Sequence, residues 1–349
     1  MSGNNASGNN ASENDESDID AVLLVGFGGP EGPEDVVPFL ERVTAGRGIG
    51  PERLAEVGAH YAHFGGVSPI NEQCRAIREA LQSELDSADY SLRVYWGNRN
   101  WHPLLDEAVA QMADDGVRHA VALVTSAYSS YSSCRQYIED IEHARSAVGA
   151  DALRIDKIRP YFDHPGFVEP FIRATRDALV RLGATDPPPL VFTAHSIPVA
   201  MAKACDYEAQ LRATMDLVAD AASPNSVCNL VWQSRSGSVA VPWLEPDVND
   251  HLRRLAAQGH RQAVLIPIGF ISDHIEVLWD LDHQAASTAD ESGLRIERAA
   301  TPGTAPDPEF IAMARELIEE RLGRLSPRAL SALPARPRDC APGCCVFKI

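Results

Sequence analysis

Long apolar segments are missing from this sequence. No run approaches the roughly 20 apolar residues that a membrane-spanning helix requires, and no basic-then-apolar signal peptide opens the chain. We therefore expect a cytoplasmic protein without an integral membrane segment. Positive charge is also scarce: 31 Lys and Arg stand against 49 Asp and Glu, a net charge of −18. This balance argues against a nucleic-acid partner, because nucleic-acid-binding domains usually carry a basic patch.

A complete dinucleotide-binding fingerprint is missing too. The apolar run 21–27 (AVLLVGF) is typical of a buried parallel strand, and it leads into GFGGPEG. Gly26 and Gly28 fit the G-x-G-x-x-G pattern, but Glu31 occupies the third glycine position and Pro30 lies inside the turn. A carboxylate there would repel a pyrophosphate, so a tight turn is favoured over a nicotinamide site.

The sequence does contain a repeated alternation of strand and helix patterns. The 349 residues, 45% of them hydrophobic, suffice for about two domains. Short apolar runs predict strands at 21–27, 92–97, 120–125, 153–161, 190–194, 229–232, 264–268 and 294–298. Two such series predict an α/β protein with two doubly wound parallel-sheet lobes and a ligand cleft between them.

Composition divides the chain into four parts. Residues 1–20 repeat SGNNA and then become acidic without Lys or Arg, so we expect a disordered tail. Residues 21–165 and 166–325 are expected to form an N-terminal and a C-terminal lobe. Residues 326–349 are expected to form a tail that contains cysteine.

The stretch 266–283 (IPIGFISDHIEVLWDLDH) changes from a strand pattern to a helical one. Asp273, Glu276, Asp280 and His283 are spaced three, four and three residues apart, which on a helix places them along one face. Three carboxylates and an imidazole beyond the carboxyl end of a strand can hold a hard cation or carry protons. Taken alone, the pattern also fits a solvated helix face.

A second polar segment follows the strand expected at 120–125. Ser and Tyr hydroxyls crowd residues 126–132, and Arg135 adds a cation. Such a loop suits hydrogen bonds to the carboxylates of a ligand, although its composition is also that of an ordinary polar loop.

Six motifs together resemble the ferrochelatase family. In chain order, between Leu23 and Arg324, they are FGGPEGPEDVVPFL, HFGGVSPIN, FTAHSIP, VWQSRSG, PWLEPDV and PIGFISDHIEVLWDLD. The resemblance implies two Rossmann-like lobes around a porphyrin cleft, with a porphyrin and ferrous iron as substrates. Details resemble the actinobacterial branch, which implies insertion of Fe²⁺ into coproporphyrin III to form coproheme in haem b synthesis. Protohaem formation from protoporphyrin IX is the alternative, and transient contact with other haem-pathway enzymes is compatible with either.

The resemblance also implies site residues. His195 in FTAHSIP matches the catalytic histidine, and Glu276 in DHIEVLWD matches the carboxylate that faces it across the macrocycle; both are implied ligands of Fe²⁺. Ser68 in GGVSP and Tyr137 in SCRQY match positions that contact porphyrin propionates, and Tyr61 is expected to join them. Without the resemblance, His195 would be interpreted as a residue that holds its turn.

The chemistry of metal insertion agrees with these residue types. Insertion releases two pyrrole protons, and an imidazole with a reference pKa of about 6.5 is available as a base near neutral pH. We predict that His195 accepts pyrrole protons while Glu276 and its acidic neighbours serve metal and proton transit. Phe27 stands where relatives carry a tyrosine axial to the metal, so no such ligand is expected here.

Seven cysteines are expected to be reduced in the cytoplasm. Cys340, Cys344 and Cys345 lie within the last ten residues, a pattern that indicates metal binding rather than a disulfide. Some ferrochelatases resemble this chain and hold a [2Fe–2S] cluster with three C-terminal cysteines and one internal cysteine, for which Cys134 is the first choice. The other internal cysteines are Cys205 and Cys228, which compete with it, and Cys74, which is expected to be buried. Free thiols in a disordered tail are the alternative.

Two further functions are weighed against iron insertion. A cobalt or nickel chelatase for a related tetrapyrrole stays open, because ligand type says little about the choice of metal. A protein that stores or carries haem without chemistry is disfavoured by the presence of both His195 and Glu276.

Overall fold

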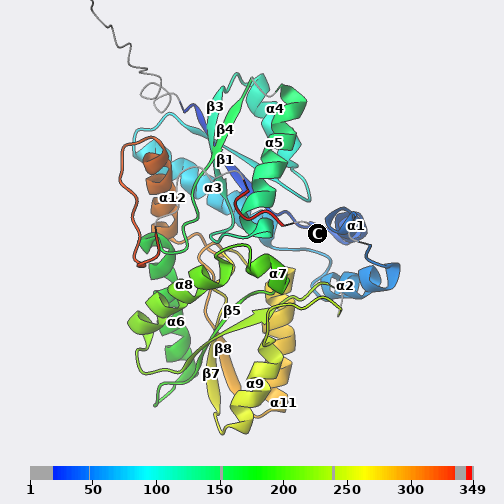
Figure 1. Ribbon diagram of the computed structural model, residues 1–349, viewed down its shortest axis with the longest axis vertical. Helices are drawn as coiled ribbons and strands as arrows, with labels where there is room; N and C mark the ends of the chain where they lie inside the picture. Colours follow the sequence, from blue (N-terminus) through cyan, green and yellow to red (C-terminus); the bar gives the residue numbers. More distant parts are fainter. Residues whose placement is uncertain (1–18, 47, 150–151, 238–239, 335–342, 348–349) are drawn as a thin grey trace, which may run out of the picture.

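The computed structural model describes residues 19–46, 48–149, 152–237, 240–334 and 343–347. Two four-stranded sheets form the centres of two lobes, one above the other in Figure 1. All strand pairs are parallel, in the orders β2-β1-β3-β4 and β6-β5-β7-β8. The predicted α/β fold with two doubly wound lobes is therefore confirmed.

The first lobe contains β1 (Ala21–Gly26), η1 (Pro33–Asp35), α1 (Val36–Thr44), α2 (Pro51–His63), α3 (Ile70–Ser87), β2 (Arg93–Asn98), α4 (Leu105–Asp114), β3 (His119–Val124), η2 (Tyr131–Arg135), α5 (Gln136–Val148) and β4 (Arg154–Lys157). The second contains α6 (Pro165–Leu182), β5 (Leu190–His195), α7 (Val199–Ala202), α8 (Tyr207–Ala222), β6 (Cys228–Gln233), α9 (Val248–Ala257), β7 (Gln262–Ile266), α10 (Ile275–Val277), η3 (Leu278–Ala285), α11 (Ala286–Glu291), β8 (Arg295–Arg298) and α12 (Pro308–Arg321).

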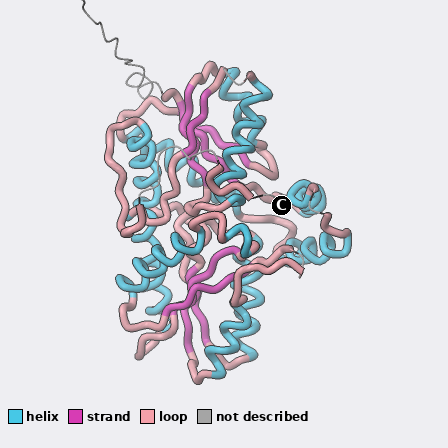
Figure 2. The backbone as a smooth tube through the Cα atoms, viewed as in Figure 1, coloured by secondary structure: helices cyan, strands magenta, loops and turns pink. Residues whose placement is uncertain are grey.

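The central strands are buried on both faces because helices cover each sheet on two sides (Figure 2). In β1, Val22 and Leu24 belong to one apolar cluster, while Leu23 and Val25 belong to another on the opposite face. Period-two alternation between two cores explains why the sequence of this strand is apolar throughout. The strand expected at 153–161 is shorter, because only residues 154–157 pair with β3.

The structure bears on two of the expected domain boundaries, the end of the N-terminal tail and the extent of the second lobe. Residues 1–18 of the expected tail lie outside the described residues. Asp20, which was expected in the tail, belongs to the fold. Its carboxylate accepts hydrogen bonds from the backbone N–H groups of Arg118 and His119 at 2.9 and 3.1 Å. Helix α12 packs against both α6 and α3, so the last helix of the second lobe also covers the first. The other domain limits stay a prediction.

Hydrogen bonds from the loop that follows β3 join the two lobes. The Tyr128 hydroxyl donates to the Ile268 carbonyl at 2.9 Å, while the Ser129 N–H donates to Oε1 of Gln210 on α8 at 2.7 Å. These residues belong to the hydroxyl-rich segment whose expected role was to bind ligand carboxylates. Tyr128 and Ser129 are buried and instead hold the lobes together.

No helix within the described ranges is both long enough and apolar enough to cross a membrane. The expectation of a cytoplasmic location stays a prediction.

A buried ion pair ties α12 to the segment after β4. Arg159 donates from Nε and Nη2 to the two carboxylate oxygens of Glu320 at 2.7 and 2.9 Å. The side chains of Arg159 and Glu320 are only 6% and 7% exposed. Removing one partner leaves the other charge buried and unpaired, which is much more costly than losing an exposed pair.

We predict that Glu320→Ala lowers the free energy of unfolding by about 3–5 kcal/mol, because the Arg159 guanidinium then has no counter-charge. Arg53→Ala, which removes the exposed pair of Arg53 with Glu56, is the matched control and should cost no more than about 1 kcal/mol. Urea denaturation measures both. Equal effects of the two substitutions would contradict the importance of the buried pair.

Candidate active site

His195 is the last residue of β5 and pairs with Gln233, the last residue of β6, at the carboxyl edge of the second sheet. Its Nδ1 lies 2.5 Å from the Ser196 carbonyl oxygen, which can only accept a hydrogen bond. Nδ1 therefore carries the proton in the neutral ring, and the lone pair of Nε2 is free to bind a metal or accept a proton. The turn is held by the Ser196 N–H, which donates to the Gln233 carbonyl at 2.8 Å.

Glu276 lies in α10, and its Oε2 is 3.6 Å from Nε2 of His195. Both residues come from the second lobe. A macrocycle between them would need about 7 Å, two van der Waals contacts of roughly 3.5 Å each. The expectation that the two groups face each other across the porphyrin is therefore wrong for this arrangement: imidazole and carboxylate form one pair, which can address a single face of a flat substrate.

The expected row of acidic residues on one helical face is broken. Residues 278–285 form a π-helix, and Asp273 lies in the loop before α10, so α-helical spacing does not apply. The Asp273 carboxylate accepts two hydrogen bonds from Arg298 at 3.0 and 3.1 Å and is buried, which makes it a structural anchor. The His283 ring packs instead against the rings of Trp279 and His63, with centroids 4.4 and 4.5 Å away.

Asp280 is the acidic residue that stays close to the pair. Burial raises the pKa of its carboxyl to about 7, and the Glu276 charge adds to this, whereas the Ser234 hydrogen bond and His195 oppose it. The Ser234 hydroxyl donates to Oδ2 of Asp280, and Gln233 Nε2 donates to the Glu276 carbonyl at 3.1 Å. Asp280 can therefore gain or lose a proton near neutral pH beside the candidate catalytic pair.

Three residues near the pair were not identified from the sequence. His274 accepts a hydrogen bond at Nδ1 from the Glu276 N–H at 3.2 Å, and burial lowers the pKa of its imidazole, so it is a neutral cap of α10. Gln233 and Ser234 approach Glu276 and Asp280 from β6. The positive φ of Ser234, 60°, leaves no trace in the residue type, whereas the position of His274 inside the DHIEVLWD motif was an available signal.

The expected porphyrin contacts come from three segments of the first lobe, and all three are largely buried. Tyr61, on α2, is influenced by the pair: burial raises the pKa of its hydroxyl, and the Glu276 charge adds to the shift. Ser68 precedes α3, and its N–H donates to the Pro30 carbonyl at 2.8 Å. Tyr137, on α5, lies under the Arg99 guanidinium, 4.5 Å from the ring centroid. Within the part of the chain that the structure describes, neither Ser68 nor Tyr137 forms a hydrogen bond with His195.

The described C-terminal residues approach the loop that contains Cys134. Cys344 Sγ and Cys345 Sγ are 3.7 Å apart. Burial raises the pKa of the Cys345 thiol to about 12, and the sulfurs of Cys344, Cys134 and Cys205 add to the shift. Cys340 lies outside the described residues. Among the residues that are described, no three His, Cys, Asp or Glu side chains converge as a metal site.

Comparison with known proteins adds to this geometry. The model of the family described as ferrochelatase matches residues 19–322. The chain belongs to the ferrochelatase family. It is 51% identical over 342 residues to the coproporphyrin III ferrochelatase of Nocardia farcinica, which covers 94% of this chain and 96% of that protein. The corresponding protein of Mycobacterium tuberculosis is 50% identical over 347 residues, 95% of this chain and 96% of that one.

Solved structures of low sequence identity share the fold of this ferrochelatase. SirB from Bacillus subtilis with Fe³⁺ superposes with a TM-score of 0.56 at 12% identity, covering 88% of this chain and 98% of that one. The sirohydrochlorin chelatase SirB from Bacillus subtilis subspecies spizizenii, in complex with cobalt, gives 0.53 at 10% identity, with the same coverage. At such identities the likeness shows the two-lobed architecture alone.

We predict that Asp280→Asn removes a pH-dependent loss of stability. A carboxyl with a pKa of about 7 in the folded protein and 3.8 in the unfolded chain stabilises the fold below pH 3.8, and this stabilisation is lost as pH rises through 7. Between pH 5 and 8 the wild type should therefore lose about 2–3 kcal/mol relative to Asp280→Asn. Urea denaturation at both pH values measures this.

The control is Asp290→Asn, an exposed substitution on α11 that should follow the wild type at both pH values. If the difference between wild type and Asp280→Asn is the same at pH 5 and 8, the raised pKa of Asp280 is wrong.

Proposed function

We propose that this ferrochelatase inserts ferrous iron into coproporphyrin III and forms coproheme for haem b synthesis, as a lyase of the porphyrin-metal chelatase type. The observation that carries the proposal is the free Nε2 of His195, 3.6 Å from the Glu276 carboxylate, in a chain about half identical to coproporphyrin III ferrochelatases. Porphyrin and Fe²⁺ are the substrates. Formation of protohaem from protoporphyrin IX is the alternative.

His195 and Glu276 serve insertion as a proton acceptor and a metal ligand on one face of the macrocycle. The Nδ1–H bond to the Ser196 carbonyl leaves the lone pair of the neutral ring on Nε2, so Nε2 can take a pyrrole proton. The imidazolium that forms is stabilised by the carboxylate 3.6 Å away. The same nitrogen and the Glu276 oxygens are suitable ligands for an arriving Fe²⁺, which accepts both imidazole and carboxylate.

The second pyrrole proton needs another acceptor, and Asp280 provides one. Its pKa of about 7 means that it exchanges protons without a large energetic penalty near neutral pH. Ser234 donates to its carboxylate and Gln233 lies beside it, so the proton-carrying group is fixed in place.

The first lobe would supply the other side of the porphyrin site. Phe27, directly after β1, is 37% exposed and can contact a flat ring, while Ser68, Tyr61 and Tyr137 are our proposed porphyrin contacts. Tyr61 is favoured among them by its electrostatic proximity to Glu276. Tyr137 would be held in position by Arg99, whose guanidinium covers its ring and pairs with the Asp140 carboxylate.

An oxygen-free assay with Fe²⁺ and each of the two porphyrins tests the proposal. We expect a higher kcat/KM with coproporphyrin III than with protoporphyrin IX, and a loss of about 100-fold or more in kcat for Glu276→Gln, with porphyrin binding retained. Glu291→Gln, at an exposed residue that ends α11, is the matched control and should keep wild-type activity. Preference for protoporphyrin IX would overturn the substrate assignment, and near-normal turnover of Glu276→Gln would remove Glu276 from the mechanism.

We further propose that Cys134, Cys340, Cys344 and Cys345 hold a [2Fe–2S] cluster. Four thiolates are the donor set such a cluster requires, and the mutual influence of the Cys345, Cys344 and Cys134 sulfurs supports the grouping. Cys205 competes as a ligand, because it contributes to the same shift. When bound, the cluster can exchange one electron, whereas metal insertion itself exchanges none. The proposed role of the cysteines is therefore structural: they would attach the C-terminal cysteines to the η2 segment, which contains Cys134.

The visible spectrum of protein purified without oxygen tests the cluster. We expect a red-brown protein, and loss of that absorption in Cys134→Ser, because one of four ligands is removed. Cys228→Ser is the control and should keep the absorption, since Cys228 lies on β6 with its Sγ 3.4 Å from the Ser226 carbonyl. A colourless wild type would end the cluster proposal and leave the chelatase proposal untouched.

A further inference from the structure

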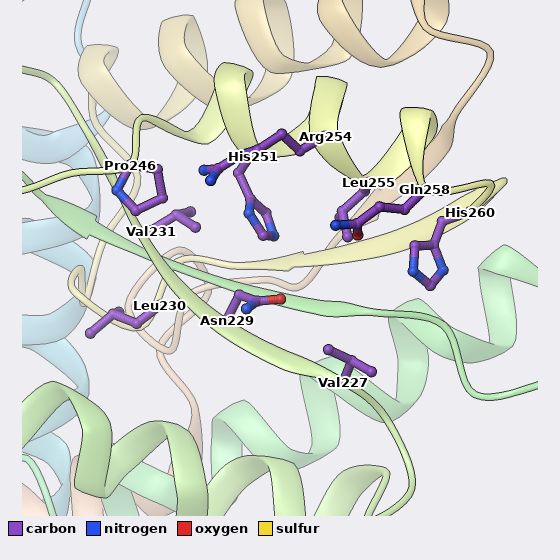
Figure 3. A pocket seen from close by; sticks show the side chains of 10 residues that line it. All are labelled: Val227, Asn229, Leu230, Val231, Pro246, His251, Arg254, Leu255, Gln258 and His260. Carbon is purple, nitrogen blue, oxygen red and sulfur yellow. The ribbon is translucent and has the colours of Figure 1, made fainter.

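A cavity of about 380 Å³ lies between strand β6 and helix α9 of the second lobe, away from His195 (Figure 3). Strand β6 is the edge of its sheet, and α9 covers it on one side. The size falls within the roughly 300–1,000 Å³ of small-molecule sites. The β6 residues of the lining are Asn229, Leu230 and Val231, whereas Gln233, beside the candidate catalytic pair, is the last residue of the strand.

In β6, the edge strand of its sheet, the backbone groups of alternate residues point away from β5. The carbonyls of Val227 and Gln233 accept hydrogen bonds from the β5 side, so odd-numbered residues of this strand point to β5 and even-numbered ones to the free edge. The Trp232 N–H indeed donates outward, to the Pro246 carbonyl at 2.9 Å. Leu230, two residues earlier, directs its backbone groups to the same open edge.

A buried imidazole points into the same space without a hydrogen bond. His251, on α9, is 8% exposed, and its Nε2 has no partner among the described residues. Figure 3 shows its ring directed from α9 towards β6. An unpaired buried polar atom is energetically costly, and a ligand that forms a hydrogen bond with it would remove that cost.

The lining favours an anion with an apolar body. Arg254 lies close enough to His251 that its charge, after burial, lowers the pKa of the imidazole. His260 and Gln258 add further hydrogen-bond donors, and none of the ten described lining residues is acidic, although the chain carries a net charge of −18. Apolar side chains complete the wall: Val227, Val231, Pro246 and Leu255.

We infer that the β6–α9 cavity binds a small carboxylate with a flat or compact apolar body, held by the Arg254 guanidinium and the His251 Nε2–H. The carboxylate accepts hydrogen bonds from both groups, and the apolar part packs against the apolar side chains of the cavity wall. The site is separate from the porphyrin and metal site.

Benzoate is the probe, and the imidazole C–H resonances of His251 in the full-length protein, assigned by their loss in His251→Gln, are the readout. We expect a saturable shift with benzoate, and at least tenfold weaker binding in Arg254→Gln. Arg254 is exposed, so this variant should fold normally. The shift should persist in His195→Ala, since His195 does not line the cavity.

Arg253→Gln is the matched control. Arg253 is exposed on the same helix and pairs with Asp250 at 3.0 Å, so its loss should leave benzoate binding unchanged. Benzylamine, with the same ring and opposite charge, and inorganic phosphate, without a ring, should give no saturable shift. The proposal is overturned if benzoate gives none, if benzylamine or phosphate binds as well, or if Arg254→Gln binds benzoate like the wild type.

Discussion

The candidate active site depends on the register in which β5 pairs with β6. His195 and Gln233 are paired as the last residues of their strands, and the Ser196 N–H closes the edge by donating to the Gln233 carbonyl. The Gln233 amide then donates to the Glu276 carbonyl. The register of this strand pair therefore positions three parts of the site: the His195 imidazole, the Ser196 turn that selects its tautomer, and the backbone of Glu276. A slip by one residue would turn His195 to the opposite face of the sheet.

Two carboxylates near this pair, Asp273 and Asp280, have different surroundings and therefore different roles. Asp273 accepts hydrogen bonds from Arg298 and Thr301, so it anchors the loop. Among the described residues, the donors to Asp280 are the neutral Ser234 hydroxyl and Gln233 amide, and its burial next to Glu276 raises its pKa to about 7. Asp280 lies in the π-helix, a type of segment often found at functional sites.

Much of this could be predicted from the sequence. Short apolar runs identify the strands, and the resemblance of FTAHSIP and DHIEVLWD to ferrochelatase motifs leads to His195 and Glu276. What could not be predicted depends on long-range partners: Arg298, 25 residues after Asp273, turns that carboxylate into an anchor. The π-helix likewise escapes prediction, since residue spacing assumes 3.6 residues per turn. Hydroxyl-rich composition cannot tell a ligand loop from an interlobe contact, and Tyr128 belongs to the second.

Several polar residues near the proposed binding site have a structural role, because they form hydrogen bonds between the two lobes. The Tyr128 hydroxyl bonds the loop after β3 to the Ile268 carbonyl. Gln73 accepts a hydrogen bond at 2.9 Å from the N–H of Asp273, which lies just before α10. Both contacts join the carboxyl edges of the two sheets, the edges where open α/β sheets bind ligands. Since His195 and Glu276 both belong to the second lobe, the first lobe would contribute the opposite wall of the proposed porphyrin site. These two contacts help to hold the lobes at a fixed spacing there, so the room for a flat substrate would depend in part on hydrogen bonds between the lobes.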